Sequence, residues 1–292
     1  MKSKIPVFHI SNYKNHPDNK GEIYIKSFAD HICEHDFIDT PHSHDFYLFV
    51  FCTKGHGKHH IDFKTYDFKP NRLFILNPGQ IHHWTLSEDI EGSILFFKPS
   101  FYFTKFPQKT SKDVPVLRSM SSINYVDFSK EKGAQLFGVL KELSVHNTSN
   151  STWKDEIFAS YINILIHLVL DSVEEMESEI SSLPQLNNHY LIKFEDVLEC
   201  NFYKEHKVSF YANEIGVSPE HLNRLCKKHF QKSSKKMINE RIVLEARRLL
   251  CQNENSIQMV ADELHFSDLS NFVKFFKRET LTTPAKFRID YR

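Results

Sequence analysis

Polar side chains of the kind that contact base edges recur at helical spacing in PEHLNRLCKKHF, residues 219–230. Leu222, Leu225 and Cys226 fall on one side of a helix of this sequence, so the polar residues point elsewhere. In a major groove, an arginine can fork onto guanine and an asparagine onto adenine. The residues expected to contact DNA here are Glu220, His221, Asn223, Arg224 and Lys227. On a lone helix, such a face is more often simply hydrated.

The chain carries the pattern of residues 212–230 a second time, at residues 261–279. Ala212 pairs with Ala261 and, after one extra residue in the second copy, Arg224 pairs with Lys274. Leu269 and Val273 of the second copy either touch thymine methyl groups or pack inside the protein. The duplication favours a shared role, for which we expect the first copy to supply most of the sequence specificity. The residues expected to contact DNA in the second copy are Ser270, Asn271, Lys274 and Lys277.

Each copy predicts a short helix, a turn and a second helix, which together form a helix-turn-helix. Gly216 fits the first turn because glycine adopts positive φ without a Cβ clash. Ser218 supplies a capping hydroxyl before Pro219, and Ser267 stands at the corresponding place in the second copy. Residues 238–256 predict a connecting helix, and roughly fifteen residues at 1.5 Å each span about 20 to 25 Å. That length holds the two units about one duplex turn apart.

Histidines flank an apolar run in the N-terminal half, at His42, His44 and His82, and Trp84 follows closely. Three imidazoles can hold zinc, copper or iron. Imidazole and indole groups can instead hydrogen-bond a small ligand in an apolar cavity. Short β-branched and aromatic runs between turns over residues 20–105 predict a sandwich or barrel. We expect these four residues, with His83, to line the barrel mouth and bind a small ligand without a metal.

Two amphipathic helices follow the strands, since apolar residues recur at helical spacing from Glu131 onward. The second helix, from Trp153 to Met176, is apolar over much of its circumference. It either packs entirely on the barrel or also forms a dimer contact through Ile164 and Leu168.

The polar stretch 178–188 carries Pro184 and separates two expected domains, residues 1–180 and 189–292. The chain has 292 residues and a formal net charge of zero. The second domain holds 18 Lys and Arg against 14 Asp and Glu, a small surplus that weakly favours a polyanionic partner. Five cysteines without a CxxC pair indicate reduced thiols in the cytoplasm. No secretion signal or membrane span is expected.

The C-terminal repeat resembles the DNA-binding domain of AraC-type transcription regulators. In that family the second helix of each unit contacts bases, which implies this role for the polar residues named above. Two departures are His265 and Leu281, which stand where the family usually has glycine. Leu281 predicts a differently shaped end to the last base-reading helix. The positions that carry the resemblance are Val260, Ala261, Phe266, Phe272, Phe276, Lys277, Thr283, Pro284, Phe287 and Arg288.

The stretches PHSHDFYLFVFCTKG and LNPGQIHHW resemble the two conserved stretches of cupins, small β-barrels found ahead of this DNA-binding domain in many such regulators. His42, His44 and His82 match three of the four ligands of metal-binding cupins. Leu48 stands where those cupins have a glutamate. The resemblance implies an α+β chain with a cupin-like barrel and flanking helices, followed by an all-α domain of two helix-turn-helix units joined by a long helix.

Three hypotheses remain open at this point. The first is a cytoplasmic, homodimeric transcription regulator that binds double-stranded DNA and a small-molecule effector, with RNA polymerase as a possible further partner and no cofactor. The second is a cupin-type metalloenzyme with an accessory DNA-binding domain, against which Leu48 argues. The third is a protein-binding adaptor, which does not explain the doubled unit. The sequence names no effector, operator or regulated gene, and it does not distinguish an activator from a repressor.

Overall fold

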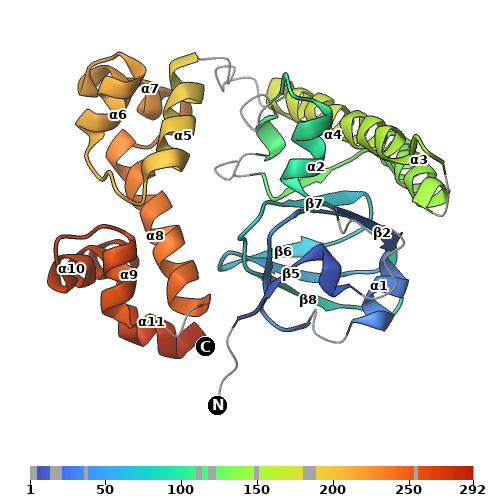
Figure 1. The fold of residues 1–292 in the computed structure, drawn as a ribbon, viewed down its shortest axis with the longest axis horizontal. Coiled ribbons are helices and arrows are strands. Elements are labelled where there is room, and N and C mark those ends of the chain that lie inside the picture. The colour runs from blue at the N-terminus through green and yellow to red at the C-terminus, as the bar shows by residue number, and fades with distance from the viewer. Residues whose placement is uncertain are drawn as a thin grey trace. The chain divides into compact units, whose positions relative to one another are not determined.

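The chain folds into two compact units, one of residues Pro6–Ile180 and one whose main part is Ser181–Arg292 (Figure 1). The computed structural model describes residues 5–13, 22–35, 39–109, 114–117, 123–147, 151–179, 189–252 and 256–291. Most of the stretch expected to separate the domains, residues 180–188, lies outside the described residues. The expected β-rich first part and helical second part are confirmed.

The N-terminal unit is built on two antiparallel sheets. The larger has the order β10-β7-β4-β9-β2, and the smaller has the order β6-β5-β8. A two-stranded parallel pair, β1 (Val7–Phe8) and β3 (Ser43–His44), lies outside both. The larger sheet contains β2 (Ile23–Ser27), β4 (Tyr47–Lys54), β7 (Arg72–Leu76), β9 (Glu91–Phe97) and β10 (Tyr125–Asp127). The smaller contains β5 (Gly57–Ile61), β6 (Lys64–Phe68) and β8 (His82–Leu86).

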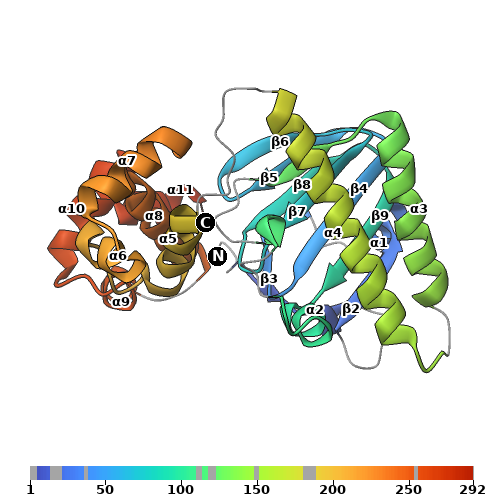
Figure 2. The same cartoon turned by 90° about the horizontal axis from the view of Figure 1, so that it is seen from above.

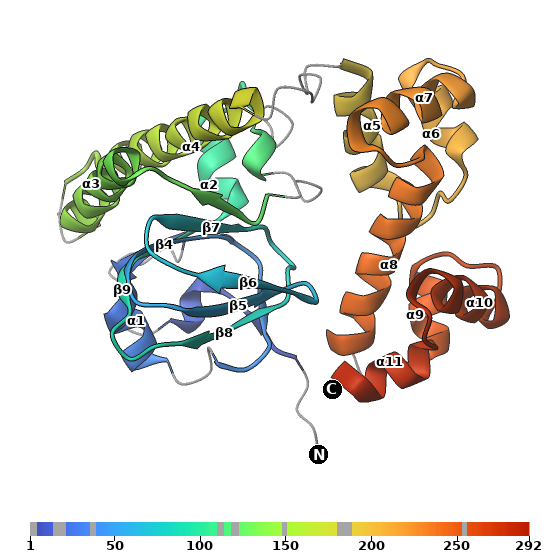
Figure 3. The same cartoon turned by 180° about the vertical axis from the view of Figure 1, so that it is seen from behind.

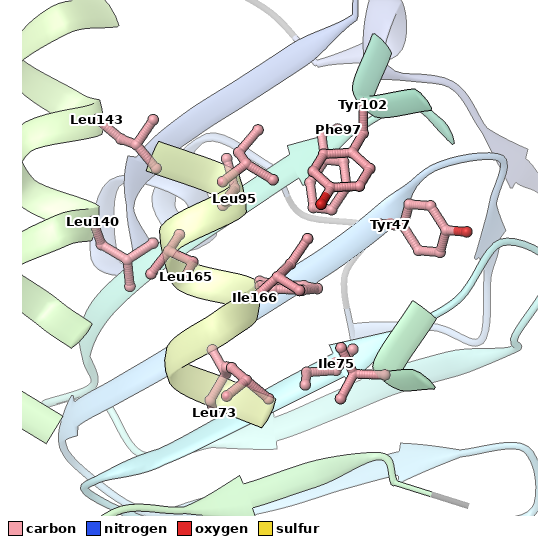
Figure 4. Packing of buried hydrophobic residues seen from close by; sticks show 14 of the residues in the cluster. Tyr47, Leu73, Ile75, Leu95, Phe97, Tyr102, Leu140, Leu143, Leu165 and Ile166 are labelled. Carbon is pink, nitrogen blue, oxygen red and sulfur yellow. The ribbon is translucent and has the colours of Figure 1, made fainter. Parts of the chain in front are cut away.

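Strand β4 lies in the middle of the larger sheet and is buried on both faces. Successive side chains of a strand point to opposite faces, so Leu48 and Val50 enter one core while Phe49 and Phe51 enter another. The first core lies between the two sheets and includes Trp84 of β8. The second lies between the larger sheet and the helices (Figure 4). Burial on both faces explains the nearly continuous apolar run of β4.

Helices α3 (Lys130–Asn147) and α4 (Lys154–Glu179) lie over the outer face of the larger sheet (Figure 2). Helix α4 buries Phe158, Ile162, Leu165, Ile166 and Val169 in the core beneath it. By length and composition alone α4 would qualify as a membrane span over Lys154–Glu175, with a mean hydropathy of 1.4. Its apolar residues instead serve largely to cover the sheet. Shorter helices are α1 (Phe28–Glu34), α2 (Pro99–Lys105), η1 (Ile10–Asn12) and η4 (Pro115–Leu117).

The side of α4 that faces away from the sheet is mixed, since Ser160, His167 and Asp171 are exposed there together with a few apolar residues. Trp153, just before the helix, and Ile164 are 68% and 45% exposed, and Leu168 is half-buried. Packing on the sheet therefore accounts for most apolar residues of α4, and the dimer contact through Ile164 and Leu168 stays a prediction.

The C-terminal unit is entirely helical, and its long helix α8 (Ser234–Gln252) runs between two groups of shorter helices (Figure 3). One group contains α5 (His189–Asn201), α6 (Val208–Ile215) and α7 (Pro219–Phe230). The other contains α9 (Ile257–Glu263), α10 (Leu269–Thr280) and α11 (Pro284–Tyr291). Helix α8 has 19 residues, which correspond to about 28 Å, so the connector is longer than expected and begins earlier.

A buried arginine joins the first helical group to α8. Arg241 of α8 donates from Nε to Glu199 of α5 at 2.8 Å and from Nη1 to Glu245 at 2.8 Å. Its guanidinium also lies 3.7 Å from the ring centroid of Phe202. The arginine side chain is only 7% exposed, and two carboxylates and an aromatic face compensate its burial.

Candidate nucleic-acid interface and barrel site

The turn between α6 and α7 has the conformation that its sequence predicts. Gly216 ends α6 at φ 78°, in the left-handed region, and its N–H donates to the carbonyls of Ala212 and Asn213. The Ser218 hydroxyl accepts a hydrogen bond from the backbone N–H of His221 at 3.1 Å. Pro219 is the first residue of α7. The predicted glycine turn and serine cap are confirmed, and the cap fixes where α7 begins.

Helix α7 buries Leu222 and Cys226 against the rest of its unit. Residues on its other side are solvent-accessible: Glu220, Arg224 and Lys227 are exposed, while His221 and Asn223 are half-buried. A hydrogen bond of 3.0 Å joins Arg224 Nη2 to His221 Nδ1, which holds the guanidinium beside the helix. The structure thus places all five expected residues of this helix on or next to one accessible face.

Asn223 has a structural contact that sequence reasoning missed. Its side-chain oxygen Oδ1 accepts a hydrogen bond of 3.2 Å from the backbone N–H of Ser234, the first residue of α8. The first N–H groups of a helix lack partners within the helix, so this contact caps α8. An asparagine needs both its oxygen and its nitrogen to fork onto adenine. Asn223 therefore gives up its cap if it contacts a base in that way.

The second turn follows the first with one residue more. His265 replaces the turn glycine and adopts φ 52°, and the N–H of Phe266 donates to the carbonyl of Ala261. The residue that caps α10 is Asp268, whose Oδ1 accepts from the N–H of Asn271 at 2.7 Å. The helix was expected to follow Ser267 directly, but it begins one residue later. The carboxylate one residue later fills that place, because Ser267 is the extra residue.

Helix α10 buries Phe272, Phe275 and Phe276 and exposes a mixed polar and apolar face. The expected residues Ser270, Asn271, Lys274 and Lys277 are all exposed. The side-chain nitrogen of Asn271 is tied to the cap, at 2.8 Å from both Ser267 Oγ and Asp268 Oδ2. Leu269 is 37% exposed, and Val273 is half-buried.

Helices α7 and α10, the second helices of the two helix-turn-helix units, end in the same way. Gln231 and Leu281 adopt φ 54° and 62°, and their N–H groups donate to the carbonyls of Lys227 and Lys277. The expected difference in shape at Leu281 is therefore wrong. The hydrogen bond at the helix end requires a left-handed residue, and leucine adopts that conformation at a cost of about 1 to 2 kcal/mol.

A carboxylate fixes the second unit against α8. Glu279 of α10 accepts from Asn239 Nδ2 at 2.8 Å and from Lys236 Nζ at 3.2 Å, and its side chain is largely buried. Burial opposes the charged form, but hydrogen bonds from Lys236, Arg278 and Asn239 outweigh it and lower the pKa of Glu279. Lys236 and Asn239 lie near the start of α8, which follows the first helix-turn-helix unit. This contact therefore links the second helix-turn-helix unit to the part of α8 that is nearest to the first.

In the N-terminal unit, the structure brings His42, His44, His82 and Trp84 together in the core between the sheets. The ring centroids of His42 and His82 lie 4.3 Å apart, and those of His44 and His82 lie 5.1 Å apart. A fifth member, His59, was missed. Its Nε2 lies 3.1 Å from His82 Nδ1. The pairing of β5 with β8 sets His59 opposite Trp84. The membership of His59 in the cluster follows only from this register, which the sequence does not show.

These side chains are buried between the two sheets rather than exposed at an opening, and their role in binding a ligand stays a prediction. His83 points to the other face of β8 and stacks on His60 at 4.3 Å, because neighbours on a strand alternate. Leu48, at the glutamate position of metal-binding cupins, is buried in the same core. Within the described ranges, no group of three or more His, Cys, Asp or Glu side chains has an arrangement that holds a metal ion.

Burial keeps the imidazoles of this cluster neutral. It lowers the pKa of His42 to about 4 and that of His44 to about 3. Burial, and then the neighbouring imidazoles, also lower the pKa of His59 and His82. Four buried ring nitrogens have no hydrogen-bond partner among the described residues: His44 Nε2, His59 Nδ1, His82 Nε2 and Trp84 Nε1. Buried polar atoms in native proteins are normally paired, so these four atoms depart from the usual pattern.

Two family profiles match this chain. Residues 211–289 match "Helix-turn-helix domain", and residues 27–113 match "AraC-like ligand binding domain". The second range contains the histidine cluster, and the first contains both α7 and α10.

Several known proteins are similar to this chain. The transcriptional activator RhaS of Pectobacterium carotovorum is 22% identical over 85% of this chain and 86% of its own length. The probable transcription factor PqrA of Proteus vulgaris is 35% identical over 28% of this chain and 67% of its own length. The regulator ExsA of Pseudomonas aeruginosa is 29% identical, and the chain spans only 39% of its length.

Among solved structures, ToxT of Vibrio cholerae is similar over 92% of this chain and 97% of its own, at 14% identity and a TM-score of 0.41. The relatives reported above are transcription regulators, and the two profiles cover the two parts that such regulators combine. The chain belongs to the AraC family of transcription regulators, with an AraC-type DNA-binding domain after an AraC-like ligand-binding domain.

Proposed function

We propose that α7 and α10 enter successive major grooves on one face of double-stranded DNA. The observation that carries this proposal is the doubled arrangement of a capped helix with one buried and one accessible face on either side of α8. Helix α8, at about 28 Å, approaches the 34 Å of one duplex turn, and the reading helices project beyond its ends. The Glu279 contact to α8 keeps the two units from moving independently.

Individual residues take different parts in this interface. Arg224 and Glu220 are both exposed, and we assign Arg224 to fork onto a guanine and Glu220 to accept from a cytosine amino group. Lys227 and Lys277, near the ends of their helices, contact phosphates. His221 positions Arg224 through the hydrogen bond between them. In the second helix, Ser270 and Lys274 face bases, while Asn223 and Asn271 hold local structure.

The histidine cluster is the proposed effector site. Its three unpaired imidazole nitrogens and the indole N–H of Trp84 favour a compact polar ligand that can both accept and donate hydrogen bonds. Such a ligand changes DNA binding only by its difference in affinity between two arrangements of the protein. We assign residues 1–180 to sensing and dimerisation and residues 189–292 to DNA binding.

The outer face of α4 is the proposed dimer contact, with a second copy of the chain as the occupant. Ile157, Ile164 and Leu168 lie along one side of the helix, where Ile164 is exposed and the other two are half-buried. A helix face of this kind can pair with its own copy about a two-fold axis. Two linked DNA-binding domains then bind a paired site more tightly through their effective concentration.

The chain acts by binding, in the cytoplasm, and not as a metalloenzyme. The regulators to which it is similar support this proposal, as does the apolar Leu48 at the position of a metal-binding glutamate. Contact with RNA polymerase is a further part of the proposal for promoters that the protein activates.

Substitution of Arg224 tests the DNA interface. Arg224→Ala should cost about 1 to 3 kcal/mol at one base position and relax specificity there, whereas Lys228→Ala should weaken binding to all duplexes alike. Both are exposed cations on the same helix, so Lys228→Ala is a matched control. Binding measured against a set of single-base operator variants separates the two patterns. Equal losses at every position from both variants would make Arg224 a phosphate contact.

A further inference from the structure

We propose that α10 recognises thymine methyl groups through Leu269, with Val273 beside it, so that the operator carries thymines where this helix lies. The inference rests on the proposed function, in which α7 and α10 occupy major grooves. It makes the two half-sites unlike: a guanine under α7, and one or two thymines under α10.

The helix caps align the two reading helices residue by residue. Ser218 and Asp268 are both N-cap residues, so residues at equal distance from them correspond. By this alignment Leu269 corresponds to Pro219, Ser270 to Glu220, Val273 to Asn223 and Lys274 to Arg224. The second helix thus has an apolar pair where the first has a proline and an amide.

Leu269 has no evident part in the core of its own unit. Phe272, Phe275 and Phe276 fill the buried side of α10, and Leu269 lies at the first turn with 37% of its surface exposed. Val273 follows four residues later, so the two side chains are neighbours on the helix surface. Ser270 and Lys274 flank them and are exposed. This face combines a small apolar strip with polar neighbours.

The junction between α10 and α11 corresponds to the junction between α7 and α8. A comparison of the two junctions explains why position 273 need not carry an amide. Asn223 caps Ser234, the first residue of α8, whereas the corresponding helix α11 begins with Pro284. Proline has no N–H, so no acceptor is needed at that first position of the helix. Packing near this joint would be enough to account for Val273. Leu269, one turn earlier and more exposed, is therefore the residue on which the inference depends.

The chemistry of the major groove gives this strip a specific target. Thymine is the base that presents a methyl group there, whereas the other bases present hydrogen-bond donors and acceptors. Burial of one methyl group contributes about 0.8 kcal/mol, which corresponds to about a fourfold change in affinity. Replacement of thymine by deoxyuridine removes the methyl group and leaves the hydrogen-bonding edge unchanged.

The test begins with selection of duplexes from a random library by the full-length protein. Each thymine of the selected site is then replaced by deoxyuridine, one position at a time, and affinity is measured. We expect a loss of about fourfold per contacted methyl group in one half-site and no loss in the other. Leu269→Ser should abolish most of this loss. Leu281→Ser is the matched control, since Leu281 is an exposed leucine at the opposite end of the same helix.

The possible outcomes distinguish a failure of DNA binding from a failure of thymine recognition. If no duplex is enriched, the proposed DNA interface fails, and the inference fails with it. If duplexes are enriched but deoxyuridine has no effect at any position, the thymine inference is overturned while DNA binding stands. The same holds if Leu269→Ser keeps the full discrimination between thymine and deoxyuridine. Loss of discrimination in Leu269→Ser but not in Leu281→Ser supports it.

Discussion

Variants of Asn223 distinguish a role in base contact from a role in capping α8. In the structure its Oδ1 accepts the backbone N–H of Ser234 at 3.2 Å, at the start of α8. Asn223→Ala removes this acceptor and leaves the N–H at the α7–α8 joint without its partner. Asn223→Asp keeps an oxygen at that place and adds a negative charge at a helix N-terminus, which is favourable.

Loss of a helix cap costs about 1 kcal/mol. We therefore expect Asn223→Ala to lower the free energy of unfolding of the C-terminal unit by about that amount, and its melting temperature by about 4 to 8 °C. Asn223→Asp should stay within about 0.5 kcal/mol of the parent, since the charge offsets the altered hydrogen-bond geometry. Asn213→Ala, on the exposed side of α6, should change stability by no more than about 0.5 kcal/mol.

The assay is urea unfolding of residues 181–292, followed by far-ultraviolet circular dichroism. Circular dichroism is the suitable signal because both tryptophans, Trp84 and Trp153, lie in the N-terminal unit. In parallel, binding to single-base operator variants shows whether any loss is confined to one base pair. A capping role predicts an even loss over all duplexes. Unchanged stability together with a loss of about 1 to 3 kcal/mol at one adenine would refute the capping role and make Asn223 a base contact.

Three further predictions concern the rest of the chain. Arg241→Met should lower the free energy of unfolding of the C-terminal unit by about 2 kcal/mol, because its carboxylate partners lose their shared cation but are partly hydrated. Ile164→Glu with Leu168→Glu should give a folded monomer by sedimentation, whereas Val145→Glu on α3 should leave the dimer intact. The N-terminal unit should lose stability as the pH falls below about 6.5, measured by the fluorescence of its two tryptophans.

The sign of the pH effect follows from the lowered pKa values of the buried histidines. The folded barrel keeps His42 and His44 neutral to a pH of about 4 and about 3, whereas the unfolded chain takes up protons from about pH 6.5. The unfolded state therefore binds more protons as the pH falls, and the loss grows between about 6.5 and 4. Stability that is unchanged down to pH 4.5 would contradict the buried, neutral cluster.

The sequence predicted the elements that depend on local signals. Gly216, Ser218 and the apolar spacing of α7 fix a turn, a cap and a buried face within a few residues, and all three are confirmed. The doubled pattern was enough to predict both helix-turn-helix units. The start of α10 was placed one residue too early, because Ser267 and Asp268 can both cap a helix and only the extra residue decides between them.

The errors lie where distant residues meet. His59 joins the histidine cluster only through pairing of β5 with β8, and one residue of register decides that His82, not His83, faces the core. The contact between Asn223 and Ser234 depends on the angle between two helices, which no spacing in the sequence fixes. The prediction for the end of α10 was wrong because it was based on residue type. The hydrogen bond from the N–H of Leu281 to Lys277 sets the conformation there instead.

The central claim is that the two helix-turn-helix units bind a specific duplex together. The most direct measurement is the affinity of residues 189–292, without the barrel, for a selected duplex and for its scrambled sequence over a range of salt concentrations. We expect the selected duplex to bind at least about a thousandfold more tightly, and the logarithm of affinity to fall linearly with that of salt concentration. Equal affinity for both duplexes, or no dependence on salt, would contradict the claim.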